Sequence, residues 1–74
     1  MTKLYLTGTQ AAVLECTNRV CFAWNGFDLT VCFWKGKYHA QGSNQDGQRI
    51  EAECADMVEL KEQVGNQFDS LQAA

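Results

Sequence analysis

The stretch from 19 to 34, RVCFAWNGFDLTVCFW, constrains the fold more than any other part of the sequence. Two runs rich in apolar residues flank Asn25-Gly26, the dipeptide most typical of a two-residue hairpin turn. Both turn residues tolerate the positive φ that a type I′ turn requires. We therefore predict an antiparallel hairpin with strands over 19–24 and 27–34.

A two-residue turn also fixes the register of the hairpin, because it determines which residues stand opposite each other. We expect one face of the hairpin to hold three apolar pairs: Trp24 with Phe27, Phe22 with Leu29, and Val20 with Val31. Phe33 extends this face. The hairpin therefore supplies one wall of the core.

Three further segments read as strands by their alternation of apolar and polar residues. Residues 37–41 follow a second tight-turn pair, Lys35-Gly36, and should return alongside the hairpin. Residues 48–54 predict a last strand, and residues 3–7 predict a short first strand.

Residues 11–16, AAVLEC, fit two kinds of element. Ala and Leu favour a helix, which Thr9 would cap. Val13, Cys16 and the regular spacing of a meander favour a strand. We predict a strand, which makes a meander of five to six short strands.

The C-terminal segment over 56–72 predicts an amphipathic helix. Asp56 is a good N-cap. An apolar stripe at helical spacing is formed by Met57, Leu60, Val64, Phe68 and Leu71. Gly65 lies toward the edge of this stripe, where we expect a close approach to the sheet. The fold class is thus α+β, an antiparallel meander with one helix packed on one face, in a single domain over 1–74.

Charge and hydropathy narrow the classes of partner. The net charge is −3, and residues 49–74 hold six acidic but only two basic residues. This distribution argues against direct nucleic-acid binding and favours a protein partner with a basic surface. No apolar run approaches the roughly 20 residues that span a membrane, and no signal peptide is evident. We therefore expect a cytoplasmic protein with reduced thiols at its four cysteines.

The side of the predicted helix opposite the apolar stripe is acidic. Glu59, Glu62, Asn66 and Asp69 recur at helical spacing, and no Lys or Arg lies four residues after either Glu. Such a run is either a solvated face or a surface that docks on Lys and Arg of a partner. We predict the docking surface.

The outer face of the sheet is the second candidate site. Trp34 is expected there. Either it packs locally, over Cys32 and the stem of Lys37 or under the N-terminal strand, or it is a binding anchor or the centre of a homodimer interface, since Trp is enriched at hot spots. Cys32 would lie opposite His39, with Cys21 on the diagonal. These are zinc-ligand types, so a small zinc-stabilised domain is a third alternative. A fourth ligand and a third catalytic group are missing, so we expect no metal, no cofactor and no enzyme activity.

The chain as a whole resembles the small inhibitors that phages use against bacterial defence, above all anti-CRISPR proteins. The resemblance rests on the meander RVCFAWNGFDLTVCFWKGKYHAQG and on the helix ADMVELKEQVGNQFDSLQAA with Glu59, Glu62 and Asp69. It implies a non-enzymatic inhibitor of a CRISPR effector complex. Such an inhibitor would act in the host cell cytoplasm and mask a basic nucleic-acid-binding surface.

Overall fold

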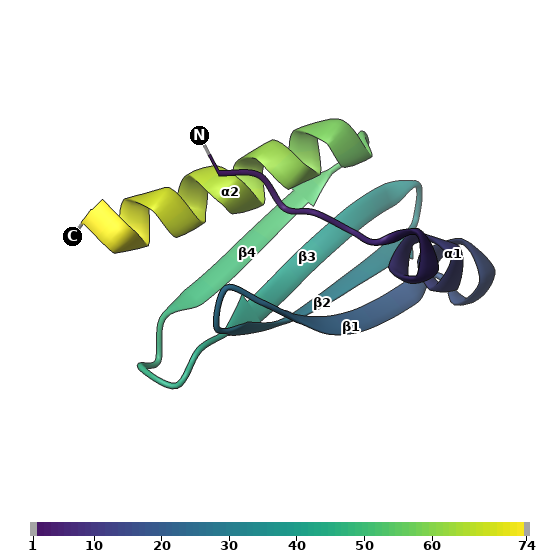
Figure 1. The fold of residues 1–74 in the computed structure, drawn as a ribbon. Coiled ribbons are helices and arrows are strands. Elements are labelled where there is room, and N and C mark those ends of the chain that lie inside the picture. The colour runs from purple at the N-terminus through teal and green to yellow at the C-terminus, as the bar shows by residue number, and fades with distance from the viewer. Residues whose placement is uncertain (1, 74) are drawn as a thin grey trace.

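The computed structural model describes residues 2–73, over which the chain forms two helices and four strands. In chain order these are α1 (Gly8–Thr17), β1 (Arg19–Trp24), β2 (Phe27–Trp34), β3 (Lys37–Ser43), β4 (Arg49–Cys54) and α2 (Met57–Ala73). The strands form one antiparallel sheet in the order β1-β2-β3-β4 (Figure 1). The α+β class and the antiparallel sheet are as predicted, but the described chain has four strands and not five to six.

The two hairpins at the centre of the sheet have the register that the sequence predicts. Trp24 pairs with Phe27 and Val20 with Val31 across the first turn, in which Asn25 and Gly26 have φ of 50° and 84°. The Lys35-Gly36 turn repeats this geometry, with φ of 51° and 79°. Positive φ at both turn positions is the signature of type I′ turns, whose twist matches that of the flanking strands.

The predicted strand over 11–16 is wrong, because this segment lies within α1. The Thr7 hydroxyl accepts a hydrogen bond from the Gln10 N–H, and the Gln10 side chain accepts one from the Thr7 N–H at 2.9 Å. This capping box satisfies two backbone donors at the start of the helix. Asn18 ends α1 in the left-handed conformation at φ 61°. The cap is thus Thr7, where the sequence had suggested Thr9.

The predicted strand over 3–7 is also wrong, since this extended segment does not join the sheet. It runs along α2 instead, and the Leu4 N–H donates to the Lys61 carbonyl oxygen at 3.1 Å. Leu4 and Leu6 are 2% and 8% exposed, so the alternating pattern correctly identified the core-facing side chains. Both belong to the buried core. The segment that carries them runs from α2 to α1 without joining the sheet (Figure 1).

Gly65 marks the contact between this N-terminal segment and α2. A Cβ atom at this position would lie 1.8 Å from the Thr2 carbonyl oxygen, so glycine is what allows the two backbones to approach. The expected close approach is therefore real, but its partner is the N-terminal segment and not the sheet.

Both helices and the N-terminal segment lie on one side of the sheet, which we call the inner face (Figure 1). There α2 packs over β4 and β3, while α1 packs over β1 and β2. The most completely buried large side chains come from the sheet and α2: Phe27, Leu29, Val31, Ile50, Leu60 and Val64. The Phe68 ring closes this core against Trp24 and Phe27, at centroid distances of 5.1 and 6.0 Å. The opposite, outer face carries no covering element from residues 2–73.

Candidate functional site

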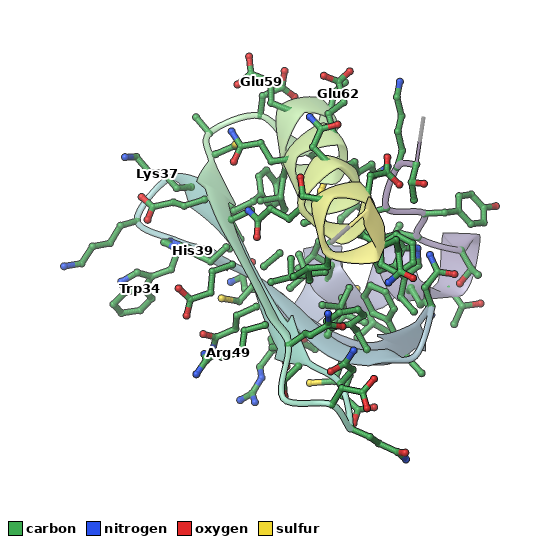
Figure 2. All side chains as sticks on the ribbon, turned by 90° about the vertical axis from the view of Figure 1, so that its left-hand side faces the viewer. Trp34, Lys37, His39, Arg49, Glu59 and Glu62 are labelled. Atoms are coloured by element: carbon green, nitrogen blue, oxygen red, sulfur yellow. The ribbon has the colours of Figure 1, made fainter. Side chains whose placement is uncertain are left out.

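The acidic side of α2 begins at the N-terminal end of the helix. Asp56 caps the helix, since its carboxylate accepts a hydrogen bond from the Val58 N–H at 3.0 Å. Glu59 and Glu62 project from this end away from the sheet (Figure 2). Glu59 and Asn66 are exposed. These side chains are therefore accessible to a partner.

The N-terminal segment engages two members of the predicted acidic site. The Glu62 carboxylate lies 3.7 Å from the Lys3 ammonium, and both side chains are about half exposed. An ion pair this exposed contributes little stability, so it leaves Glu62 free to exchange partners. The Asp69 carboxylate accepts a hydrogen bond from the Thr2 N–H at 3.1 Å. The hydrogen bonds from Thr2 lower the pKa of Asp69.

Asp69 thus holds the N-terminal segment in place. The accessible part of the acidic side is formed by the exposed Glu59 and Asn66, together with the half-exposed Glu62 in its loose ion pair with Lys3. An acidic excess remains here despite the internal contacts. Residues 2–7 and 56–73 together hold two lysines, Lys3 and Lys61, and twice as many carboxylates, at Asp56, Glu59, Glu62 and Asp69.

The second predicted site, on the outer face of the sheet, is centred on Trp34. Its side chain is 63% exposed, which is high for a tryptophan, and the Lys35 ammonium lies 5.7 Å from the ring centroid. Trp34 and His39 both point to the side of the sheet away from α2 (Figure 2). Trp34 and the acidic side of α2 are therefore two separate surfaces, which the structure does not bring together.

A shallow, open depression of about 490 Å³ lies beside Trp34. Its lining comes from β2, β3 and β4: Cys32, Trp34, His39, Ala40, Gln41, Glu51, Ala52 and Glu53. The charges around it are compensated, since Glu53 lies 3.3 Å from the Lys37 ammonium and 3.6 Å from His39, and Arg49 lies 3.0 Å from Glu51. In contrast to the side of α2, this surface has little net charge to attract a charged partner.

The zinc alternative is not supported by the side chains that the structure describes. Cys32 does face His39 across β2 and β3, as predicted. However, the described residues contain no group of three or more His, Cys, Asp or Glu that could hold a metal ion. All four cysteines are free thiols.

Two thiols differ in their acidity. The Thr30 hydroxyl, 3.4 Å from the Cys21 sulfur, is the main cause of a lowered Cys21 pKa. Burial raises the pKa of the Cys54 thiol. The Cys21 thiol is therefore the more reactive of the two.

Sequence reasoning missed two contacts that shape these surfaces. The first is the N-terminal segment along α2, for which Gly65 within an apolar stripe was the available signal. The second is the side-chain amide of Gln67, which accepts from the Glu51 N–H at 3.0 Å and donates to the Glu51 carbonyl oxygen. A polar residue on a helix gives no sequence signal for such a contact with a strand edge.

Neither helix of the described chain is long and apolar enough to cross a membrane. Comparison of the chain with known protein families, with curated proteins and with solved structures found no match.

Proposed function

We propose that this protein acts by binding and not by catalysis, and that it docks the acidic side of α2 on a basic protein surface. The observation that carries the proposal is the excess of carboxylates over lysines on this side of the molecule, with Glu59 exposed at its tip. Such a surface attracts Lys- and Arg-rich partners over several ångströms and accelerates their encounter.

The resemblance to phage inhibitors suggests which basic surface is involved. A CRISPR effector complex holds its nucleic acids in a positively charged channel. A row of carboxylates on a rigid helix can occupy such a channel in place of phosphates. In this proposal the protein acts in the host cell cytoplasm as a stoichiometric inhibitor.

The test measures binding of the purified protein to immobilised CRISPR effector complexes at low and high salt, and the resulting loss of nucleic-acid binding by the complex. The variant Glu59→Lys/Glu62→Lys should lose binding at least about tenfold, because it replaces attraction with repulsion. Asp69 is left intact because it binds Thr2.

The matched control is Glu15→Lys/Asp46→Lys, which makes the same change in net charge at two exposed positions outside α2. It should bind within about threefold of the unmodified protein, because charges outside the interface act on the partner only through weak long-range attraction. If both variants lose the same affinity, the net charge of the protein and not the acidic side of α2 determines binding, which would contradict the proposal. Unchanged affinity in the α2 variant would also contradict it.

A second candidate is a structural or assembly module that forms a homodimer through the outer face of the sheet. The specific observation in its favour is Trp34, which is 63% exposed on a sheet face that residues 2–73 leave uncovered. An exposed Trp is the side chain most enriched at interface hot spots. This candidate predicts a dimer that Trp34→Ser dissociates in sedimentation equilibrium.

A further inference from the structure

The free edge of β1 exposes backbone groups that β2 does not use. In a hairpin closed by a two-residue turn, alternate residues of each strand bond to the neighbouring strand, beginning with the pair Trp24 and Phe27. The same ladder continues past the end of β1, where the Phe33 N–H donates to the Asn18 carbonyl oxygen at 2.9 Å. Arg19, Cys21 and Ala23 therefore direct their backbone N–H and C=O groups away from the sheet.

One of these outward groups already has a neighbour, since the Thr17 hydroxyl lies 2.8 Å from the Arg19 carbonyl oxygen. The same hydroxyl lies 2.8 Å from the Val13 carbonyl oxygen, so its single proton can remain with Val13 when Arg19 takes another partner. Within residues 2–73, the backbone groups of Cys21 and Ala23 have no hydrogen-bond partner outside the ladder. The sequence of β1, RVCFAW, contains no Pro and no Lys, the residues that commonly protect an edge strand. An edge of this kind is a template for another strand.

We propose that this edge pairs with the β1 edge of a second copy of the chain, in antiparallel orientation and centred on Cys21. Outward-facing residues must stand opposite outward-facing residues for the hydrogen bonds to form. The register centred on Cys21 pairs Cys21 with Cys21 and Arg19 with Ala23, so that every outward-facing residue of both copies finds a partner. Registers centred on Val20 or Phe22 leave one such residue of each copy unpaired.

Charge complementarity favours a second copy over an unrelated strand. In this register Arg19 of one copy lies opposite Ala23 of the other, and Asp28 is the neighbour of Ala23 in β2. The three side chains share the outer face, and strands are spaced about 4.8 Å apart, so an arginine can extend across the small alanine to the aspartate. In the described chain neither Arg19 nor Asp28 belongs to an ion pair. Because the dimer has two-fold symmetry, this ion pair between Arg19 and Asp28 forms at two equivalent places.

The inner face of the pairing is apolar as well. Val20 of one copy stands opposite Phe22 of the other, and Phe22 is half-buried on the inner face in the single chain. Cross-strand contacts between an aromatic and a β-branched side chain stabilise a sheet. The product is a continuous eight-stranded sheet with four strands from each copy.

The experiment measures the dimer dissociation constant by sedimentation equilibrium, with circular dichroism as a check that each variant is folded. Arg19→Asp and Asp28→Arg should each raise this constant at least about tenfold, because each places like charges side by side at both symmetry-related contacts. The double variant Arg19→Asp/Asp28→Arg restores the pairing with its signs exchanged, and its constant should return to within about threefold of the original.

Ala23→Pro supplies an independent test, because it removes an outward N–H and leaves the bonds to β2 intact. It should abolish the dimer, whereas Trp34→Ser should retain it. A monomer at all concentrations up to about 1 mM, which corresponds to a binding free energy weaker than about −4 kcal/mol, would overturn the proposal. So would a dimer that survives Ala23→Pro and dissociates in Trp34→Ser, since that result assigns the interface to the outer face. Failure of the double charge variant to recover would overturn the proposed register.

Discussion

The two edge strands of the sheet are protected to very different degrees. On β4, the Gln67 amide bonds to both outward backbone groups of Glu51, as the backbone of a neighbouring strand would. The side chains of β4 also place charges along this edge, at Arg49, Glu51 and Glu53. On β1, the one side chain of residues 2–73 that reaches an outward backbone group is Thr17, whose hydroxyl divides its single proton between the Arg19 and Val13 carbonyl oxygens.

The difference in protection between the two edges follows from the helix that packs near each of them. The 17-residue α2 packs over β4 and presents Gln67 to the backbone of Glu51, in the middle of that strand. The 10-residue α1 packs on the inner face and ends at Thr17, directly before β1 begins, so among the outward backbone groups of that strand it reaches only the Arg19 carbonyl oxygen. A helix protects a strand edge where it runs alongside it, and a short helix at the strand's start leaves most of the edge open.

The largest change in the free energy of unfolding is expected at Gly65, where the N-terminal segment packs against α2. Gly65→Ala should destabilise the protein by about 1–3 kcal/mol, because the new methyl group would collide with the Thr2 carbonyl oxygen. In an open position the same change would stabilise a helix by about 0.5–1 kcal/mol. Urea unfolding measures the difference.

Gly8→Ala is the matched control on the α1 side, since a Cβ at Gly8 would meet nothing within 4 Å. It should be neutral or slightly stabilising. If Gly65→Ala proves as mild as Gly8→Ala, the close packing of the segment on α2 is contradicted.

A smaller effect is expected at the protected edge. Gln67→Ala removes two hydrogen bonds to the Glu51 backbone and should cost about 1–2 kcal/mol. Hydrogen exchange at the Glu51 amide should accelerate, and β4 should become as able to pair with another strand as β1.

Gln63→Ala, at an exposed position one turn earlier on α2, should leave the Glu51 amide protected. Equal exchange at Glu51 in the two variants would show that Gln67 does not protect this edge.

The smallest effect is expected at the start of α1. Thr7→Ala removes the hydroxyl that caps this helix and should cost about 1 kcal/mol, measured by thermal unfolding. Thr9→Ala, two residues further on and exposed, should cost less. The reverse order of the two would mean that the helix begins at the cap that the sequence first suggested.

Much of the fold was predictable because the signals are local. Asn25-Gly26 and Lys35-Gly36 determine both central hairpins and their registers, and the stripe from Met57 to Leu71 determines α2. The α1 segment was assigned to the wrong class because its apolar residues mark no single face: Leu14 is its buried residue, while Val13 is 41% exposed. The capping box of Thr7 and Gln10 was the better guide.

The candidate sites were predictable only where the position of a residue depends on a single helix or strand. Glu59 and Glu62 are accessible as expected because the spacing of α2 alone places them. Asp69 proved to be a structural contact, since its partner Thr2 lies 67 positions away in the chain and no local pattern links the two. The edge of β1 is open because α1 ends at Thr17, before the strand begins. This could not be predicted while residues 11–16 were assigned to a strand.

The order of the strands also has a consequence for how the chain folds. Each strand pairs with the strand that follows it, so the loops that must close before the sheet forms are short and cost little entropy. Joining Leu4 to Lys61 instead requires almost the whole chain to be in place. We therefore expect rapid zippering of the hairpins, with the N-terminal segment attaching last and detaching first. Its departure would uncover the apolar strip beneath Leu4 and Leu6 and release Glu62 and Asp69 in the same event.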